Sequence, residues 1–129
     1  MRRLYALAVV VGLGLAISGP RAYAGDWTPL GERVVDERAL EESIAVRTDG
    51  PYKQIKLLVK VNPLKIMNVK VAFRDGTSFD ATLDTYVPPG VSTQAIELPA
   101  AKPIAKVTFT CKKVGSGVYP PVVRLLGAR

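Results

Sequence analysis

The spacing of the lysines is the feature of this sequence that points to a chemical role. Lys56, Lys60, Lys70, Lys106 and Lys112 stand in segments where polar and apolar residues alternate, so all five are expected to point outward from β-strands. Rows of outward ammonium groups attract anionic polymers and lipid head groups. If their strands share one sheet, that sheet has a basic outer surface, and the five lysines are its candidate binding residues.

The acids are separated from these lysines along the chain. All eleven Asp and Glu residues lie within residues 26–49 and 75–97, whereas 51–74 and 98–129 contain none. Ordinary solvation is the alternative interpretation, because outward lysines also keep strands soluble and block edge pairing. A cross-strand pair between Lys70 and Asp80 would further dilute the basic surface.

Nucleophilic chemistry has few candidates. The chain of 129 residues contains no His, and its one cysteine, Cys111, follows Val107 and Phe109 on the apolar face of an expected strand. A thiol in that position, without a neighbouring base, is expected to behave as a small buried hydrophobic group. The alternative is an intermolecular disulfide, which an odd cysteine in an exported protein allows.

Acid-base and metal chemistry are not indicated either. Asp80 and Asp84 alternate outward on one expected strand, and a hydrolase would need such acids to face each other in a cleft. Segment 75–80 lacks the length and ligand density of a calcium loop, and one Cys without His cannot form a zinc cluster within one chain. Nucleophile and phosphate-loop motifs are missing. We predict no catalytic residue, no metal ligand and no cofactor.

The aromatic residues give weaker indications. The three phenylalanines alternate inward, so no aromatic platform interleaves with the lysines, and nucleic acid is not an expected partner. Tyr86 and Tyr119, beside proline turns, are candidates for stacking on a sugar. Trp27 is expected to plug the core.

Residues 1–24 have the features of a signal peptide. Arg2 and Arg3 precede an apolar run that ends at Ile17, and Ala22-Tyr23-Ala24 fits the small-x-small cleavage rule. The run is short for a membrane span, which needs about 20 residues. We therefore expect export to the periplasm or the medium, with no transmembrane segment after cleavage. The leader holds three arginines and no acid, so cleavage lowers the net charge from +7 to +4.

Residues 25–129 are expected to form one antiparallel β domain. Strict alternation, typical of half-buried antiparallel strands, covers residues 55–61, 67–73 and 106–112. Weaker strand signals cover residues 31–35, 43–47, 77–87, 93–98 and 122–127. Only Glu37–Glu42 could form a helical turn. About eight short strands separated by Pro and Gly turns predict an all-β antiparallel sandwich.

One hairpin can be predicted in register. Arg74-Asp75-Gly76 fits a three-residue loop with Gly76 in the left-handed conformation. This register pairs Phe73 with Thr77, Val71 with Phe79, Val69 with Ala81, and Lys70 with Asp80.

The order of the core and turn motifs resembles a known family. The motifs are Trp27-x-x-Leu30-Gly31, Ile44-x-Val46, Val69-x-Val71-x-Phe73-x-Asp75-Gly76, Ile96-x-Leu98-Pro99, Ile104-x-x-Val107-x-Phe109 and Val123-x-Leu125-x-Gly127. They are similar to those of small secreted bacterial β-sandwich proteins catalogued only as a domain of unknown function. The resemblance covers nearly all of residues 25–129. It implies export and a β-sandwich, and it supplies no catalytic or ligand residue.

The function predicted from the sequence is therefore non-enzymatic. We expect an exported module that contacts an anionic envelope polymer or lipid head groups through the lysine face. The alternative is a protein-interaction or assembly subunit of the envelope that uses a strand edge or Cys111. A hydrolase at Asp80 and Asp84 would require an acid-lined cleft.

Overall fold

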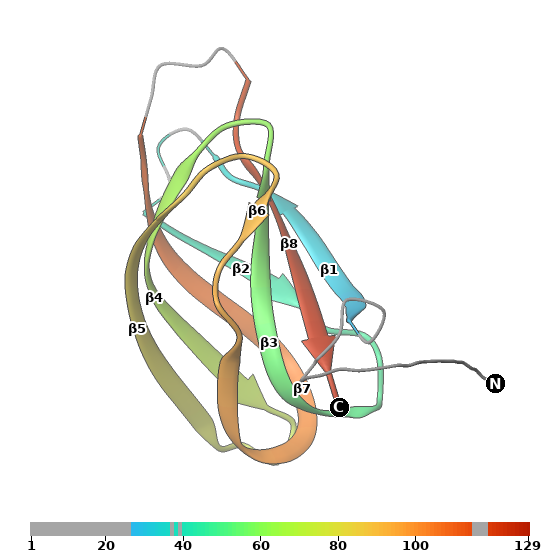
Figure 1. Ribbon diagram of the computed structural model, residues 1–129. Helices are drawn as coiled ribbons and strands as arrows, with labels where there is room; N and C mark the ends of the chain where they lie inside the picture. The colour runs from blue at the N-terminus through green and yellow to red at the C-terminus, as the bar shows by residue number, and fades with distance from the viewer. Residues whose placement is uncertain (1–26, 37, 39, 115–118) are drawn as a thin grey trace, which may run out of the picture.

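The computed structural model describes residues 27–36, 38, 40–114 and 119–129, and within them it contains eight β-strands (Figure 1). They are β1 (Thr28–Val34), β2 (Glu41–Ala45), β3 (Pro51–Lys60), β4 (Leu64–Phe73), β5 (Ser78–Val87), β6 (Val91–Ser92), β7 (Ile96–Lys113) and β8 (Val122–Ala128). Every strand pairing is antiparallel, which confirms the predicted fold class. The predicted signal peptide lies outside the described residues.

Strand β7 joins two groups of strands. Its first part, up to Pro103, pairs with β3, which is followed by β8 and then β1. Its second part, from Ile104 onward, lies between β4 and β2, and β5 pairs with the far side of β4. We call the group β1-β8-β3, with the short β6 on β3, sheet A, and the group β5-β4-β7-β2 sheet B. Figure 1 shows the two groups as two layers, with β7 passing from one to the other.

One apolar core fills the space between the two sheets. Alternate residues of β3 point into it, so Ile55, Leu57 and Val59 are fully buried while Lys56 and Lys60 face outward. Burial of each such aliphatic side chain stabilises the fold by about 1.5–3 kcal/mol. The same alternation fixes the outer faces of the sheets, where the candidate binding residues lie.

The β4–β5 hairpin has the predicted register. Val71 lies opposite Phe79 and Lys70 opposite Asp80, and Gly76 adopts a φ of +92°. The carboxylate of Asp75 accepts hydrogen bonds from the Thr77 hydroxyl, from the Thr77 backbone N–H and from the Lys102 ammonium. In that order of importance, these three contacts hold the pKa of Asp75 well below its usual range. Asp75 is therefore an ionised residue that holds the turn.

The predicted helical turn at Glu37–Glu42 is wrong for the residues that the structure describes. Glu41 and Glu42 begin β2, and the Cys111 N–H donates to the Leu40 carbonyl at 2.9 Å. Pairing with β7 therefore extends to Leu40, and this non-local contact outweighs the local helical preference.

The expected break between residues 93–98 and 106–112 is also wrong, because a single strand, β7, covers both segments from Ile96 onward. Pro99 and Pro103 fit in this strand since its first part lies at the edge of sheet A, where a missing N–H removes no ladder bond. The pairing with β3 is irregular between Tyr52 and Gln54, beside these prolines.

Strict alternation over residues 67–73 predicts that Met67 shares the inward face of Val69 and Val71, and the structure differs at Met67. A bulge between Ile66 and Asn68 shifts the pattern, so Leu64 and Ile66 are fully buried whereas Met67 is only half-buried. Such a bulge places two residues opposite one, and strict alternation cannot predict it.

Strands β1 and β2 approach each other at the open side of the sandwich. A Cβ atom on Gly31 would lie 2.5 Å from Cγ2 of Ile44 and 3.3 Å from the Ala45 carbonyl oxygen. Ile44 is itself buried in the core. The lack of a side chain at Gly31 is therefore what allows β1 to reach β2.

We predict that Gly31→Ala lowers the free energy of unfolding by about 1–3 kcal/mol, because Ile44 must move within a packed core. Urea denaturation measures the change. Gln94→Ala, at an exposed position whose side chain forms no hydrogen bond or ion pair in the described part of the chain, is the control and should change stability by less than about 0.5 kcal/mol. An equally small effect of Gly31→Ala would contradict the close packing of β1 on β2.

Candidate functional site

The five candidate lysines lie on two different sheets. Lys56 and Lys60 belong to β3 and face outward from sheet A, whereas Lys70, Lys106 and Lys112 lie on β4 and β7 in sheet B. The condition that their strands share one sheet is therefore not met. Only the three lysines of sheet B form one outward-facing group.

Ion pairs neutralise much of the charge on sheet A. Lys60 Nζ lies 3.0 Å from the Glu32 carboxylate, which also accepts a hydrogen bond from Arg124 at 3.0 Å. These two cations hold the pKa of Glu32 below its usual value, with Lys60 as the larger cause. Lys56 covers the half-buried Trp27 ring, with Nζ 4.3 Å from the ring centroid. Trp27 is thus not part of the core, contrary to the prediction.

The lysines of sheet B keep their charges available. Lys70 lies directly opposite Asp80, as predicted, yet no ion pair joins them. Among the residues that the structure describes, none of Lys70, Lys106 and Lys112 forms an ion pair with an acid. An unpaired ammonium on a sheet face is fully available to an external anion.

Lys70 and Lys106 border a shallow depression of about 250 Å³ on the outer face of sheet B. Thr108 lies opposite both Lys70 and Ser43, and Ala72 lies opposite Lys106, so small side chains separate the two ammonium groups. The Ser43 and Thr108 hydroxyls share a 2.8 Å hydrogen bond. Glu41 is the one acid among the residues that line this depression.

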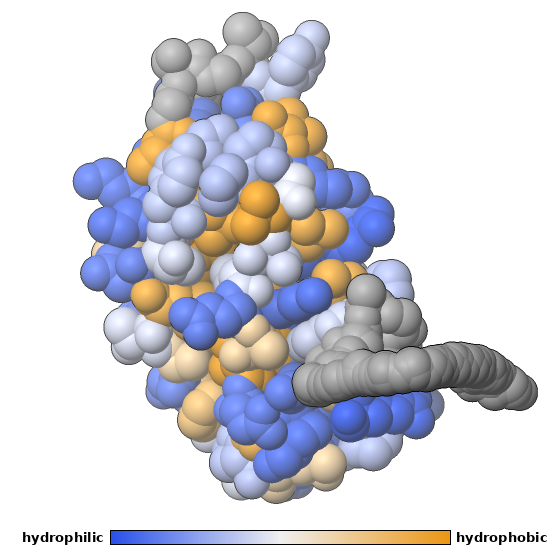
Figure 2. Space-filling view, viewed as in Figure 1, coloured by the Kyte–Doolittle hydropathy of each residue, from blue (hydrophilic) through white to orange (hydrophobic). Residues whose placement is uncertain are grey.

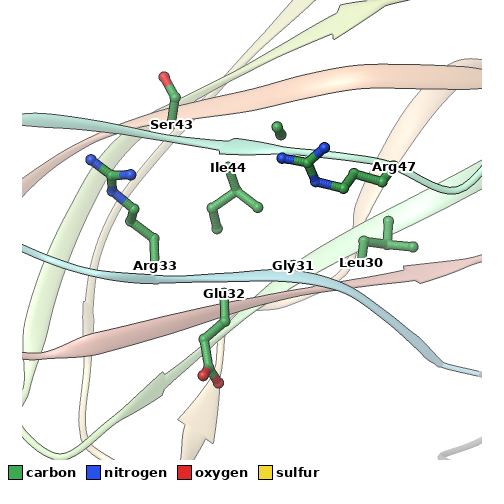
Figure 3. A pocket seen from close by; sticks show the side chains of 8 residues that line it. Leu30, Gly31, Glu32, Arg33, Ser43, Ile44 and Arg47 are labelled. Atoms are coloured by element: carbon green, nitrogen blue, oxygen red, sulfur yellow. The ribbon is translucent and has the colours of Figure 1, made fainter.

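A second depression lies on the other side of β2, in the cleft between β2 and β1 (Figure 3). It has a volume of about 340 Å³, and Arg33 and Arg47 approach it from opposite ends. The side chain of Ile44 points into the cleft, whereas that of Glu32 is turned away (Figure 3). Two guanidinium groups thus flank an apolar floor.

Backbone donors also face this cleft. The Val46 N–H donates to the Ala105 carbonyl, so the alternation of an antiparallel ladder turns the N–H groups of Ser43 and Ala45 away from β7 and toward β1. The same alternation turns the carbonyl groups of these two residues toward β1. The cleft therefore combines two guanidinium groups with the backbone N–H and C=O groups at the edge of β2, and its guanidinium and N–H groups are donors that an anion can use.

Glu42 fixes the end of the cleft at which Arg33 lies. Its buried carboxylate accepts a hydrogen bond from Arg33 Nε at 2.9 Å and another from the Asp36 N–H at 2.8 Å. In the described part of the chain, the Nη groups of Arg33 and the guanidinium of Arg47 have no hydrogen-bond partner. Glu42 thus orients Arg33 while leaving its outer donors free.

The sequence analysis did not identify Arg33 and Arg47 as binding residues. They stand in the acid-rich segment 26–49, so counting charge along the chain hides them. The one available signal was the spacing of Ser43, Ala45 and Arg47, which alternate outward along and just after β2.

The remaining candidates are dispersed. Asp80 and Asp84 face outward on β5, and neither lines the two depressions described above. Tyr86 and Tyr119 are exposed. Within the described ranges, no group of three or more Cys, Asp or Glu residues could hold a metal ion, and no helix is long and apolar enough to span a membrane.

Cys111 points into the core, as predicted, and only 4% of it is exposed. Burial raises the pKa of its thiol from 9.0 to about 11, and the negative charge of Glu42 adds to the shift. The folded protein therefore holds about 100-fold less thiolate at neutral pH than the unfolded chain does. Because the unfolded thiol ionises first, this residue favours folding below pH 9 and loses that contribution as the pH rises through about 11.

We predict that iodoacetamide alkylates Cys111 of the native protein at least about 100-fold more slowly than that of the urea-unfolded protein, at the same pH near 8. Mass spectrometry over time measures both rates. Similar rates in the two states would contradict the burial of this thiol and would reopen its role in an intermolecular disulfide.

The comparison with known families covers almost the whole chain. Residues 6–127 match the family model described as "Domain of unknown function (DUF2541)". No curated protein and no solved structure matches the chain. The matched residues include all the strands that carry the core and both depressions. The predicted resemblance to a family of unknown function is confirmed, and the chain belongs to the DUF2541 family.

Proposed function

We propose that the protein is an exported, non-enzymatic module that binds an anionic polymer of the cell envelope along β2. The observation that carries the proposal is the pair Lys70 and Lys106, which border one depression without an ion pair to any described acid. An anion that settles there displaces no intramolecular partner of either lysine, so little of the attraction is lost to competition.

The cleft between β1 and β2 extends this surface. Ser43 lines both depressions, so the Lys70–Lys106 depression and the Arg33–Arg47 cleft meet at β2. A flexible chain with regularly spaced phosphate or carboxylate groups could contact both sides of the strand at once. Contacts from one polymer at two linked sites strengthen each other through their high effective concentration.

The surface is suited to binding rather than to reaction. Its cations are lysines and arginines, and no described thiol lines either depression. The acids beside the cations are Glu32 and Glu41, which line the depressions, and Glu42, whose buried carboxylate is hydrogen-bonded to Arg33. Shallow, solvent-exposed depressions do not exclude water, as most active sites must. Affinity there is expected to be modest and strongly dependent on salt.

Reversing the two lysine charges tests the proposal. We predict that Lys70→Glu with Lys106→Glu lowers binding to immobilised polyphosphate and to isolated cell envelopes at least about tenfold at low salt, because two attractions become repulsions. Binding of the original protein should fall steeply as salt is raised. Immobilised polyglutamate, compared with polyphosphate, distinguishes a carboxylate ligand from a phosphate ligand.

The matched control is Lys56→Glu with Lys60→Glu, which changes the net charge equally but lies on sheet A. This variant should keep most of its binding to immobilised polyphosphate, which contains no lipid. Equal losses in both variants would show that net charge, rather than the surface along β2, attracts the polymer, and would refute the proposal. Circular dichroism checks that each variant is folded.

A strand-adding protein partner is the second candidate function, and one observation favours it. Strand β5 is ten residues long and pairs only with β4 in the described part of the chain, so its outer edge has unpaired backbone groups. Main-chain pairing is insensitive to salt. Envelope binding that survives both high salt and the lysine reversals would favour this partner over the polymer.

A further inference from the structure

The large exposed hydrophobic side chains of the described residues are gathered at one end of the sandwich. We call this end, where β3 ends and β4 and β8 begin, the loop end. The side chains are between 46% and 75% exposed and belong to Val34, Leu40, Val61, Tyr86, Val91 and Tyr119. Figure 2 shows hydrophobic surface around this end, in the upper half of the view.

The strand registers place all six residues at this end. Val34 lies opposite Val122, the first residue of β8, and Val91 lies opposite Val59, near the end of β3. Tyr86 lies opposite Lys65, at the start of β4, and the Leu40 carbonyl accepts from Cys111 near the end of β7. Val61 and Tyr119 stand in the connections that precede β4 and β8. Val34 and Tyr86 face outward from the two opposite sheets, whereas Leu40, Val61 and Tyr119 stand in three separate connections at this end.

Val61 exposes its side chain from a strained backbone conformation. Its φ of 78° is in the left-handed region, which β-branched residues rarely occupy. A Gly or Asn residue would adopt this conformation more easily, but neither residue would expose an apolar side chain. Strain of this kind persists mainly where function requires it.

The segments that present these residues are held in place by each other. The Asn62 side-chain amide donates to the Tyr119 carbonyl, and the Gly90 N–H donates to the Val59 carbonyl at 2.8 Å. Prolines stiffen the same segments at positions 63, 88, 89, 120 and 121. A rigid apolar end loses little conformational entropy when it docks.

Three lysines, Lys60, Lys65 and Lys112, lie close to the apolar residues of the loop end. Lys60 immediately precedes Val61, and Lys65 lies directly opposite both Tyr86 and Lys112. Like charges directly opposite each other destabilise a sheet unless an anion lies between them. Asp84 lies 3.4 Å from Lys65 and Glu32 3.0 Å from Lys60, whereas Lys112 has no ion pair in the described part of the chain.

We propose that the loop end docks onto a bilayer with anionic head groups. The apolar and tyrosine side chains of this end, together with Lys112, which has no ion pair in the described part of the chain, match the boundary between acyl chains and head groups. A bilayer fits better than a protein partner because apolar side chains from three separate connections can each enter a fluid phase, whereas a protein would need a matching rigid surface. This contact is independent of the polymer surface along β2 and leaves that surface exposed.

Vesicle flotation with the full protein tests the proposal. The protein should float with vesicles of phosphatidylethanolamine and phosphatidylglycerol, and at least about tenfold less with phosphatidylcholine alone. Leu40→Gln, Val61→Asn and Tyr119→Ser combined should lower the floated fraction at least about tenfold. All forms are compared with the same N-terminus, verified by mass, so that residues 1–24 cannot account for a difference.

Two further variants make the result specific. Leu126→Gln replaces a half-buried apolar residue of β8 beside Lys56, far from the loop end, and should float as the original protein does. Val61→Asn alone should unfold at an equal or higher urea concentration while binding vesicles less, because it relieves the left-handed strain. Failure of the original protein to float, or equal loss with Leu126→Gln, would overturn the proposal and favour an apolar protein partner.

Discussion

The passage of β7 from one sheet to the other is the constraint on which the rest of the structure depends. Because this strand pairs with β3 in its first part and with β4 and β2 in its second, it determines which residues share a face. It separates Lys56 and Lys60 from Lys70 and Lys106. It also places β2 at the open side of sheet B, where β2 meets β1.

The contact between β1 and β2 shows how packing and electrostatics combine. Gly31 lets the strands approach at one end, and at the other the buried Glu42 carboxylate accepts the Asp36 N–H as a carbonyl would. The same carboxylate orients Arg33. A buried carboxylate is costly unless it is paired and hydrogen-bonded, and here both contacts also shape the cleft that we propose as part of the binding surface.

Local features of this protein could be predicted from its sequence, whereas sheet membership could not. The hairpin at Gly76 and the inward face of Ile55, Leu57 and Val59 follow from turn chemistry and alternation, which act between near neighbours. The bulge at Met67 and the grouping of Lys70 with Lys106 depend on contacts with β7, far away in the sequence. The alternation of polar and apolar residues predicts that a lysine side chain points outward from its strand, but it does not predict to which sheet that strand belongs.

The distribution of charge along the chain gave a wrong prediction of one basic face for a similar reason. The acid-free segments suggested one basic face, yet strand pairing brings acids to many of their cations, as Glu32 reaches Lys60 and Asp75 reaches Lys102. The informative quantity is the charge that remains without a partner after folding. By that measure, Lys70 and Lys106 with the free donors of Arg33 and Arg47 are the cations that surround β2.

The most direct test of the surface along β2 is an NMR titration of the ¹⁵N-labelled protein with polyphosphate at low salt. We predict that amide shifts concentrate at Ser43, Ala45, Ala72 and Thr108 and vanish when salt is raised. Shifts concentrated around Lys56 and Leu126 on sheet A, or no shifts at all, would contradict it.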